Sequence, residues 1–273
     1  ALGIHPQRSF PALAQQRFSA WFQDHKDGQK HSKGEEVLFF YDTFLEHNNP
    51  EIGQAAVRVL EKAGCQVIVP PHKVDSGRPA VSKGLLDKAK SLAQHNVALL
   101  TPYARRGIPI VGCEPSSMAM LTHEYPDLIP GPKTQALATA CSMLDAFIVR
   151  EVREGSIQFD FDDRPRRILF HGHCQQKANY VTRATRQMLS LIPNAIVEET
   201  QAGCCGMAGS FGYEKEHYQL SLQIAELTLA PQVRQADPET MICASGTSCR
   251  EQIRHTTNRD AKHPIQIFAA ALR

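Results

Sequence analysis

Short apolar runs of strand length alternate with helical patterns along this chain, and the alternation begins again after the midpoint. The first round starts with the run from Val37 to Tyr41, and the second starts with Ile168 to Phe170. These runs lack the polar–apolar alternation of a half-exposed strand, so helices are expected to cover both faces of each sheet. The pattern predicts an α/β fold with mostly parallel sheets flanked by helices.

The expected elements follow from the spacing of apolar residues and from the glycines and prolines between them. In the first round we expect strands at 37–41, 66–69 and 108–111, and helices at 51–63, from 82 onward, and at 134–155. In the second round we expect strands at 168–170, 195–197 and 241–243, and helices at 180–191 and 216–229. A further amphipathic helix is predicted over residues 12–22.

The two rounds also share landmarks. Phe44 corresponds to Cys174, residues 75–77 correspond to 204–206, and residues 114–117 correspond to 246–249. The gaps between landmarks agree to within about three residues, which is the signature of a repeated structural unit. We therefore predict two homologous lobes, 35–155 and 156–273, preceded by a polar lead-in or linker over 1–34. Because the chain opens without an initiator Met, we expect a piece of a longer polypeptide.

Composition and charge exclude several classes of protein. Lys and Arg number 30 against 28 Asp and Glu, so the net charge of +2 gives no electrostatic case for nucleic acid as a main partner. The apolar runs are too short for a transmembrane segment. No secretion signal is recognisable, so a cytoplasmic location is expected, with peripheral attachment to the inner membrane left open. In a reducing compartment, the eight cysteines are more often metal ligands or redox groups than disulfides.

Four cysteines follow predicted strands of the second lobe: Cys174, the adjacent pair Cys204 and Cys205, and Cys249. The carboxyl ends of parallel strands form the ligand-binding crevice of an open α/β sheet, so these thiols are expected to converge. Four thiolates complete the ligand set of a tetrahedral zinc ion or an iron–sulfur cluster. The alternative is that they are small buried hydrophobic residues. That alternative is the expectation for Cys65, Cys113 and Cys141.

Three segments of the second lobe carry a resemblance to a known family: Phe170-His-Gly-His-Cys174, Gly203-Cys-Cys-Gly-Met-Ala-Gly-Ser-Phe-Gly-Tyr213 and Gly246-Thr-Ser-Cys-Arg-Glu-Gln-Ile253. They resemble the cysteine-rich, CCG-type domain that occurs in heterodisulfide reductases and in the iron–sulfur components of glycolate and lactate oxidation systems. The chain resembles in particular the C-terminal part of bacterial FAD-linked oxidases of the D-2-hydroxy-acid (D-lactate or D-2-hydroxyglutarate) dehydrogenase type. The resemblance covers about residues 35–270.

This resemblance implies a module that supports electron transfer, or substrate binding, next to a flavin. Its implied partners are an FAD-binding domain and a ferredoxin-like domain of the parent polypeptide. The chain itself carries neither a Gly-x-Gly-x-x-Gly fingerprint nor a ferredoxin-type cysteine run. FAD is therefore expected on the upstream domain, and the isolated chain is not expected to be active as an enzyme. Formation of a homo-oligomer is left open.

The sequence departs from the family pattern in both lobes. No metal is expected in the first lobe, because this chain has other residues at the positions where relatives carry cysteines. These residues are Phe44, Asp75, Ser76 and Ser117. The adjoining Gly77-Arg78-Pro79 loop is retained, which indicates packing or contact with an anion. In the second lobe Gly246 replaces a cysteine at Cys-x-x-Cys spacing, which favours a mononuclear zinc or iron, or a small cluster, over a large noncubane cluster.

Polar residues adjoin the four cysteines. His171 and His173 lie just before Cys174. Histidine can ligate a metal or transfer protons. The favoured interpretation is that these two histidines form hydrogen bonds to the metal ligands without binding the metal themselves. Arg250 and Lys177 are cations beside ligand loops, where thiolate charge would favour them. Cys243 ends a predicted strand and is either near the metal or a buried hydrophobic residue.

Two functional hypotheses follow. The first is a metal- or iron–sulfur-binding C-terminal module of an FAD-linked 2-hydroxy-acid oxidoreductase. The second is a structural zinc-binding domain, or a metal-free interaction domain, of the same large enzyme. Colour distinguishes them, because iron–thiolate centres absorb visible light and zinc does not.

Overall fold

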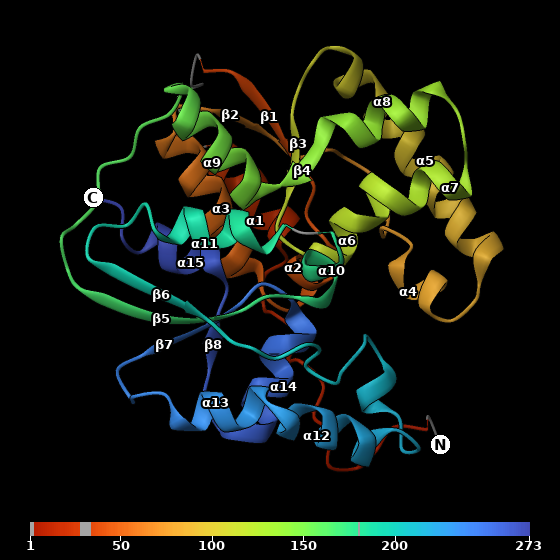
Figure 1. Ribbon diagram of the computed structural model, residues 1–273. Coiled ribbons are helices and arrows are strands. Elements are labelled where there is room, and N and C mark those ends of the chain that lie inside the picture. Colours follow the sequence, from red (N-terminus) through yellow and green to blue (C-terminus); the bar gives the residue numbers. More distant parts are fainter. Residues whose placement is uncertain (1–2, 28–33, 180) are drawn as a thin grey trace. The chain divides into compact units, whose positions relative to one another are not determined.

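The computed structural model describes residues 3–27, 34–179 and 181–273. The chain divides into two compact units, Leu13–Phe159 and Asp160–Arg273, and the described residues up to Ala12 belong with the second unit. Figure 1 shows both units, coloured along the sequence. The lead-in expected over 1–34 is thus divided between the two units where it is described; residues 1–2 and 28–33 lie outside the described residues.

In its described residues, the first unit is built on a parallel sheet with the strand order β2-β1-β3-β4. Its strands are β1 (Glu36–Phe39), β2 (Gln66–Ile68), β3 (Ile110–Gly112) and β4 (Cys141–Met143). Its helices are α1 (Phe18–Asp27), α2 (Thr43–His47), α3 (Pro50–Lys62), α4 (Arg78–Ser82), α5 (Leu86–Arg105), α6 (Pro115–Ala119), the π-helical turn η1 (Met120–Glu124), α7 (Tyr125–Leu128), α8 (Pro132–Ala140) and α9 (Leu144–Glu154).

Helices cover both faces of this first sheet. Figure 1 shows α1, α3 and α9 on one face and α5, α7 and α8 on the other. Successive residues of β1 contribute to the core on opposite faces of the sheet. On one face the completely buried Leu38 packs with Leu100 of α5 and with Ile110 of β3. On the other face Phe39 packs with Phe18 of α1. Burial on both faces explains why the strands read as continuous apolar runs.

Two helix predictions in the first unit are wrong in detail. The helix expected over 134–155 is two helices, α8 and α9, separated by β4, which adds an edge strand beside β3. Three residues of strand are too few to disturb a helical pattern of apolar residues. The helix expected from Ser82 begins at Leu86 instead, because Gly84, at φ 71°, breaks the chain between α4 and α5.

The second unit repeats the first. Its sheet is again parallel, with the strand order β6-β5-β7-β8 over its described residues. Its strands are β5 (Arg166–His171), β6 (Ala195–Glu199), β7 (Met241–Ala244) and β8 (Ala261–Lys262). Its helices are α10 (Cys174–Ala178), α11 (Thr182–Leu189), the 3₁₀ turn η2 (Phe211–Tyr213), α12 (Tyr218–Leu227), α13 (Leu229–Gln235), α14 (Thr247–Thr257) and α15 (Pro264–Ala269). Residue 180 of the expected helix 180–191 lies outside the described residues.

The predicted fold class is confirmed, because both sheets are parallel and are flanked by helices. The two sheets also share one strand order: adding four to each strand number of the first sheet gives the order of the second. The register also refines the equivalence of the two lobes. Leu38 pairs with Ile110 in the first sheet and Leu169 pairs with Ile242 in the second. Four residues after Leu38 and Leu169 lie the helix N-caps Asp42 and His173. Thr43, rather than Phe44, therefore occupies the position of Cys174.

No helix in the described part of the chain combines the length and the apolar character needed to cross a bilayer.

Candidate metal centre

The loop after β5 places Cys174 at the first position of α10, where it is exposed. His173 caps this helix through two hydrogen bonds of 3.1 Å. Its ring Nδ1 accepts one from the backbone N–H of Gln175, and its backbone N–H donates the other to Gln176 Oε1. A backbone N–H can only donate, so Nδ1 must be the acceptor and the neutral ring carries its proton on Nε2. The cap therefore fixes both the orientation and the tautomer of His173.

The Cys204–Cys205 pair lies in the loop after β6, and Gly206 forms its turn. Gly206 has a φ of 92°, and a Cβ on it would lie 2.3 Å from the carbonyl oxygen of Ser221, so no other residue fits there. The Gly206 N–H donates to Cys204 Sγ at 3.3 Å. Lys177 of α10 donates through Nζ to the carbonyl oxygens of Ala202 and Gly203, which ties this loop to the helix that begins with Cys174.

Cys249 lies in the first turn of α14, just after β7, and only 1% of it is exposed. The buried guanidinium of Arg250 donates to the carbonyl oxygens of Ala244 and Ser245 and to Thr247 Oγ1, at 2.8–3.2 Å. Arg250 therefore holds the turn between β7 and α14 that positions Cys249. The three cysteine-bearing loops follow three neighbouring parallel strands and meet at one edge of the sheet.

The four thiols act on one another electrostatically in the order Cys174, Cys204, Cys205, Cys249. Hydrogen bonds from the thiols of Cys174 and Cys205 lower the pKa of Cys204, and the Cys205 thiol likewise lowers the pKa of Cys249. The donating thiols show the opposite change: the pKa of Cys174 is raised by Cys204, and the pKa of Cys205 is raised by Cys204 and then Cys249. These mutual effects show that the four thiols are neighbours.

His171 contributes a buried nitrogen to the same place. Its Nδ1 lies 3.0 Å from Thr200 Oγ1, and its Nε2 is buried. A hydrogen bond with His171 is one of the causes that lower the pKa of the Cys249 thiol. The His171 ring therefore lies beside Cys249, on the side of the thiol cluster.

The ring of His173 occupies the place of the missing cysteine. A Cβ on Gly246 would lie 2.3 Å from His173 Cδ2 and 3.1 Å from its Nε2. A side chain at 246 and the His173 ring in this position therefore exclude each other. His173 is also one of the groups that lower the pKa of Cys204 and Cys249.

The donor chemistry of this cluster suits a soft metal, although the side chains do not form a closed shell. All eight cysteines are free thiols. Over the described residues, no group of three or more His, Cys, Asp or Glu side chains is arranged to hold one metal ion. Thiolate sulfur and imidazole nitrogen are the ligands of zinc and of iron–sulfur centres, so the residue types fit such a group. Binding would require the thiols to turn toward a common point.

The other cysteines behave as expected of small hydrophobic residues. Cys65, Cys113 and Cys141 are all buried. Cys243 is completely buried within β7, and burial raises the pKa of its thiol, opposed by the charge of Arg250. Among the described residues, the groups that act on its pKa include no other thiol.

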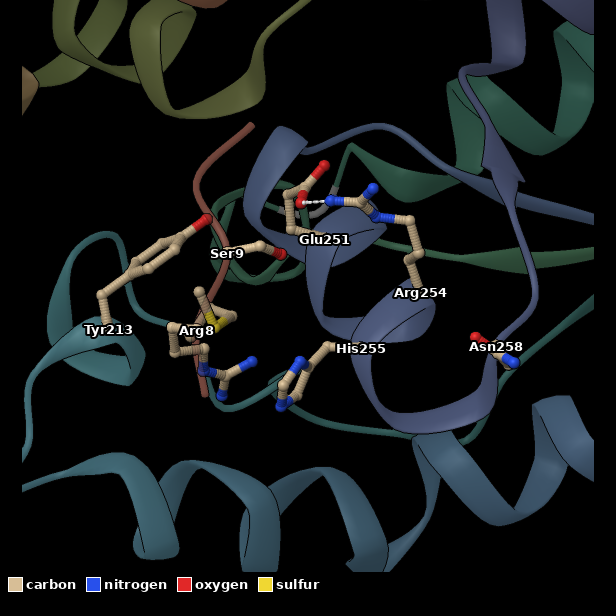
Figure 2. Close-up of a pocket in the computed structure, with 8 residues that line it drawn as sticks. Arg8, Ser9, Tyr213, Glu251, Arg254, His255 and Asn258 are labelled. Carbon is tan, nitrogen blue, oxygen red and sulfur yellow. Dashed lines mark hydrogen bonds and ion pairs between the residues drawn. The ribbon is translucent and has the colours of Figure 1, made fainter. Parts of the chain in front are cut away.

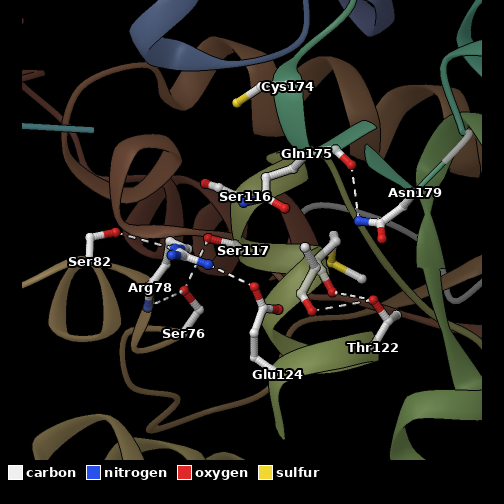
Figure 3. Close-up of polar contacts among 12 residues, drawn as sticks. Ser76, Arg78, Ser82, Ser116, Ser117, Thr122, Glu124, Cys174, Gln175 and Asn179 are labelled. Carbon is white, nitrogen blue, oxygen red and sulfur yellow. Dashed lines mark hydrogen bonds and ion pairs between the residues drawn. The ribbon is translucent and has the colours of Figure 1, made fainter. Parts of the chain in front are cut away.

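The first unit places oxygen atoms where the second unit places sulfur. Thr43 Oγ1 donates to Asp75 Oδ2 at 2.6 Å, and Ser76 Oγ donates to Ser117 Oγ at 3.2 Å, which matches the pairs Cys174–Cys204 and Cys205–Cys249. Figure 3 shows the serine pair beside Arg78.

The adjoining Gly77-Arg78-Pro79 loop serves its own unit. Arg78 Nη1 forms an ion pair of 2.7 Å with Glu124, and Arg78 Nε donates to Ser82 (Figure 3). Gly77, at φ 89°, matches Gly206, at φ 92°.

Comparison with known proteins agrees with this geometry. Residues 168–254 match the model of the cysteine-rich (CCG) domain family. The matched segment contains all four cysteines of the candidate centre, and the resemblance noted from the sequence is thereby confirmed.

Curated relatives extend the similarity beyond the CCG segment. The chain is 26% identical, over its whole length, to one of the subunits of the anaerobic glycerol-3-phosphate dehydrogenase of Escherichia coli (strain K12), and it covers 68% of that protein. It is 27% identical to D-2-hydroxyglutarate dehydrogenase of the same strain, over 86% of the chain and 22% of that protein. It is 24% identical to lactate utilization protein A of Exiguobacterium sp., over 81% of the chain and 89% of that protein. The chain is thus a cysteine-rich module similar to dehydrogenase-associated proteins.

Proposed function

We propose that this chain is the metal- or iron–sulfur-binding module of a larger FAD-linked 2-hydroxy-acid oxidoreductase. Cys174, Cys204, Cys205 and Cys249 would hold the metal group. The observation that carries the proposal is that three loops, each following a neighbouring parallel strand, bring these four thiols next to one another. Thiols used only for packing have no reason to gather at the ligand-binding edge of a sheet.

The residues around the thiols suit a negatively charged metal–thiolate group. His171 and His173 are both among the groups that lower the pKa of Cys249, so both would stabilise a thiolate there. Lys177 and Arg250 hold two of the ligand loops by their carbonyl oxygens while adding positive charge. An iron–sulfur group, when bound, would supply a site that accepts and passes on single electrons.

The flavin would lie on another part of the enzyme. The chain spans only 22% of D-2-hydroxyglutarate dehydrogenase, so most of such a relative is outside the matched region. We propose an FAD-binding domain and a ferredoxin-like domain as fused or associated partners, and a cytoplasmic location, with attachment to the inner membrane through the partners. The module alone would not oxidise D-lactate or D-2-hydroxyglutarate.

Burial favours one alternative, a structural zinc site. Cys205 and Cys249 are only 4% and 1% exposed, as in closed structural sites, where no position is left open for a substrate. Zinc would then stabilise the second unit without passing electrons.

Metal analysis of anaerobically purified chain tests the proposal. We expect iron or zinc bound in the native protein, with visible absorption distinguishing iron from zinc, and loss of that metal in Cys204→Ser. Cys65→Ser is the matched control, because Cys65 is a buried thiol of the first unit, and its metal content should be unchanged. Absence of bound metal from anaerobic protein, or equal loss in both variants, would contradict the proposal.

A further inference from the structure

A polar cavity of about 310 Å³ lies in the second unit, apart from the proposed metal ligands. It is lined by Arg8, Ser9, Met207, Tyr213, Glu251, Arg254, His255 and Asn258. Figure 2 shows Arg8, Ser9 and Tyr213 on one side, facing Arg254 and His255 of α14. This volume is at the lower end of the range for small-molecule sites, so a small ligand would fit.

Arg8 is the unusual member of this lining, because it is a buried cation without a counter-charge. Only 7% of it is exposed. Its guanidinium donates to three neutral acceptors, Gly212 O, Gln252 Oε1 and Ser221 Oγ, at 2.7–3.0 Å. No Asp or Glu of the described residues forms an ion pair with it. The Tyr218 ring, 5.1 Å away, gives only partial compensation.

The remaining charges of the lining do not cancel Arg8. Arg254 and Glu251 neutralise each other in an ion pair of 2.6 Å. Burial and the charges of Arg8 and Arg254 lower the pKa of His255, so this ring is neutral at pH 7. Burial raises the pKa of Tyr213 to about 12, so its hydroxyl keeps a proton to donate. The cavity therefore has an excess of one positive charge.

Several hydrogen-bond donors surround that charge. Ser9 and Tyr213 contribute hydroxyl groups, and Asn258 contributes a side-chain amide. The fork of Arg8 is held in place by three hydrogen bonds to its own unit, so little side-chain entropy would be lost when a ligand binds. A fixed, desolvated guanidinium surrounded by neutral donors is an environment that selects negative charge.

We propose that this cavity binds a small anion carrying a carboxylate or phosphate group. The anion would supply the counter-charge that Arg8 lacks and would accept hydrogen bonds from the hydroxyl groups of the lining. The proposal does not depend on the metal centre, because none of the lining residues is a proposed ligand.

A competing role for Arg8 is compensation of the thiolates. The Cys205 thiol is one of the groups that act on the pKa of Arg8, although after Tyr218 and Tyr213. If compensation were its only role, the cavity would hold no anion. The test must therefore measure binding of anions directly rather than metal content.

Isothermal titration of the chain with inorganic phosphate, D-lactate and glycerol provides that measurement. We expect saturable binding of phosphate or D-lactate at millimolar concentrations or below, weakened by added chloride salt, and no binding of glycerol. Phosphate and D-lactate as separate arms distinguish the two anionic groups. The Arg254→Gln variant should weaken binding at least tenfold, because it leaves the Glu251 carboxylate unpaired in the lining, where its negative charge offsets that of Arg8. Arg234→Gln is the control, because Arg234 is similarly exposed and paired with Glu226 away from the cavity, and it should bind as the native chain does.

A second measurement keeps the result independent of folding defects in a variant. On addition of phosphate to the native chain, the ring signals of His255 in NMR spectra should shift and its pKa should rise, because a bound anion opposes the field of Arg8 and Arg254. No saturable binding of either anion, equal weakening by both arginine variants, or binding that leaves the His255 signals unchanged would each overturn the proposal.

Discussion

Substitution of Gly246 by alanine is expected to destabilise the second unit through His173. The new Cβ would lie 2.3 Å from His173 Cδ2, far inside van der Waals contact, so the imidazole must turn away. That movement breaks the hydrogen bond from the Gln175 N–H and uncaps α10, a helix of five residues with little stability of its own. Loss of a cap costs about 0.5–2 kcal/mol and overpacking of a core costs about 1–3 kcal/mol. We therefore expect Gly246→Ala to lower the free energy of unfolding by about 1–3 kcal/mol.

Urea denaturation followed by circular dichroism measures this change. Trp21 is the single tryptophan and lies in α1 of the first unit, so its fluorescence gives a separate signal from that unit. Gly203→Ala is the matched control, because a Cβ at 203 meets no atom within 4 Å, and its free energy of unfolding should stay within about 0.5 kcal/mol of the native value.

A double-mutant cycle isolates the contact between the two residues. In a His173→Ala background the ring is gone, so Gly246→Ala should cause almost no further loss of stability. The reasoning is refuted if Gly246→Ala is as stable as Gly203→Ala, or if its cost is the same with and without the His173 ring.

Three further predictions follow from other parts of the structure. Burial, and next the charge of Glu114, raise the pKa of Asp42 from 3.8 to about 7, so its carboxyl group holds its proton in the folded state at pH values where the unfolded chain has lost it. The contribution of Asp42 to the free energy of unfolding should therefore be complete below pH 4 and decrease as the pH rises to 7, by about 1.4 kcal/mol for each pKa unit of the shift. In urea unfolding, Asp42→Asn should remove this pH dependence. Gly206→Ala forces a side chain against the Ser221 carbonyl at a positive φ, so it should reduce metal content and melting temperature together, whereas Gly203→Ala should change neither. Cysteines introduced at 43, 75, 76 and 117 should create a Cd²⁺ site detectable by its sulfur-to-metal absorption, and moving the first of them from 43 to 44 should abolish it; equal binding by both would refute the equivalence of Thr43 with Cys174.

The sequence was sufficient to predict the parallel α/β architecture and the placement of the cysteine-bearing loops after the strands of the second sheet. Continuous apolar runs such as 168–170 identify buried strands, and the repeated landmarks identify two lobes. The edge strand β4 could not be predicted, because it has only three residues between two helical patterns. The one-residue shift from Phe44 to Thr43 escaped detection because loop lengths differ between the lobes and only the strand register fixes the alignment.

The contacts that complete the candidate site were also beyond the sequence. Arg8 stands in a polar segment without periodicity, and its partners Gly212, Ser221 and Gln252 lie more than 200 residues away along the chain. Nothing local distinguishes it from a solvated arginine. The contact between His173 and Gly246 is similarly remote, although the absence of a cysteine at 246 was visible as a departure from the family pattern.

The placement of the three ligand loops has a consequence for the metal-free polypeptide. Loops adjacent at one edge of the sheet are far apart along the chain, with about 30 residues from Cys174 to Cys204 and about 44 from Cys205 to Cys249. A metal ion bound by all three loops would act as a reversible cross-link between them. If the ion stayed bound in the unfolded chain, each closed loop of this length would lower the entropy of the unfolded state by an amount worth about 4 kcal/mol. Release of the ion would return that freedom to the polypeptide, so the metal-free second unit should be the first part of the chain to be cleaved by proteases.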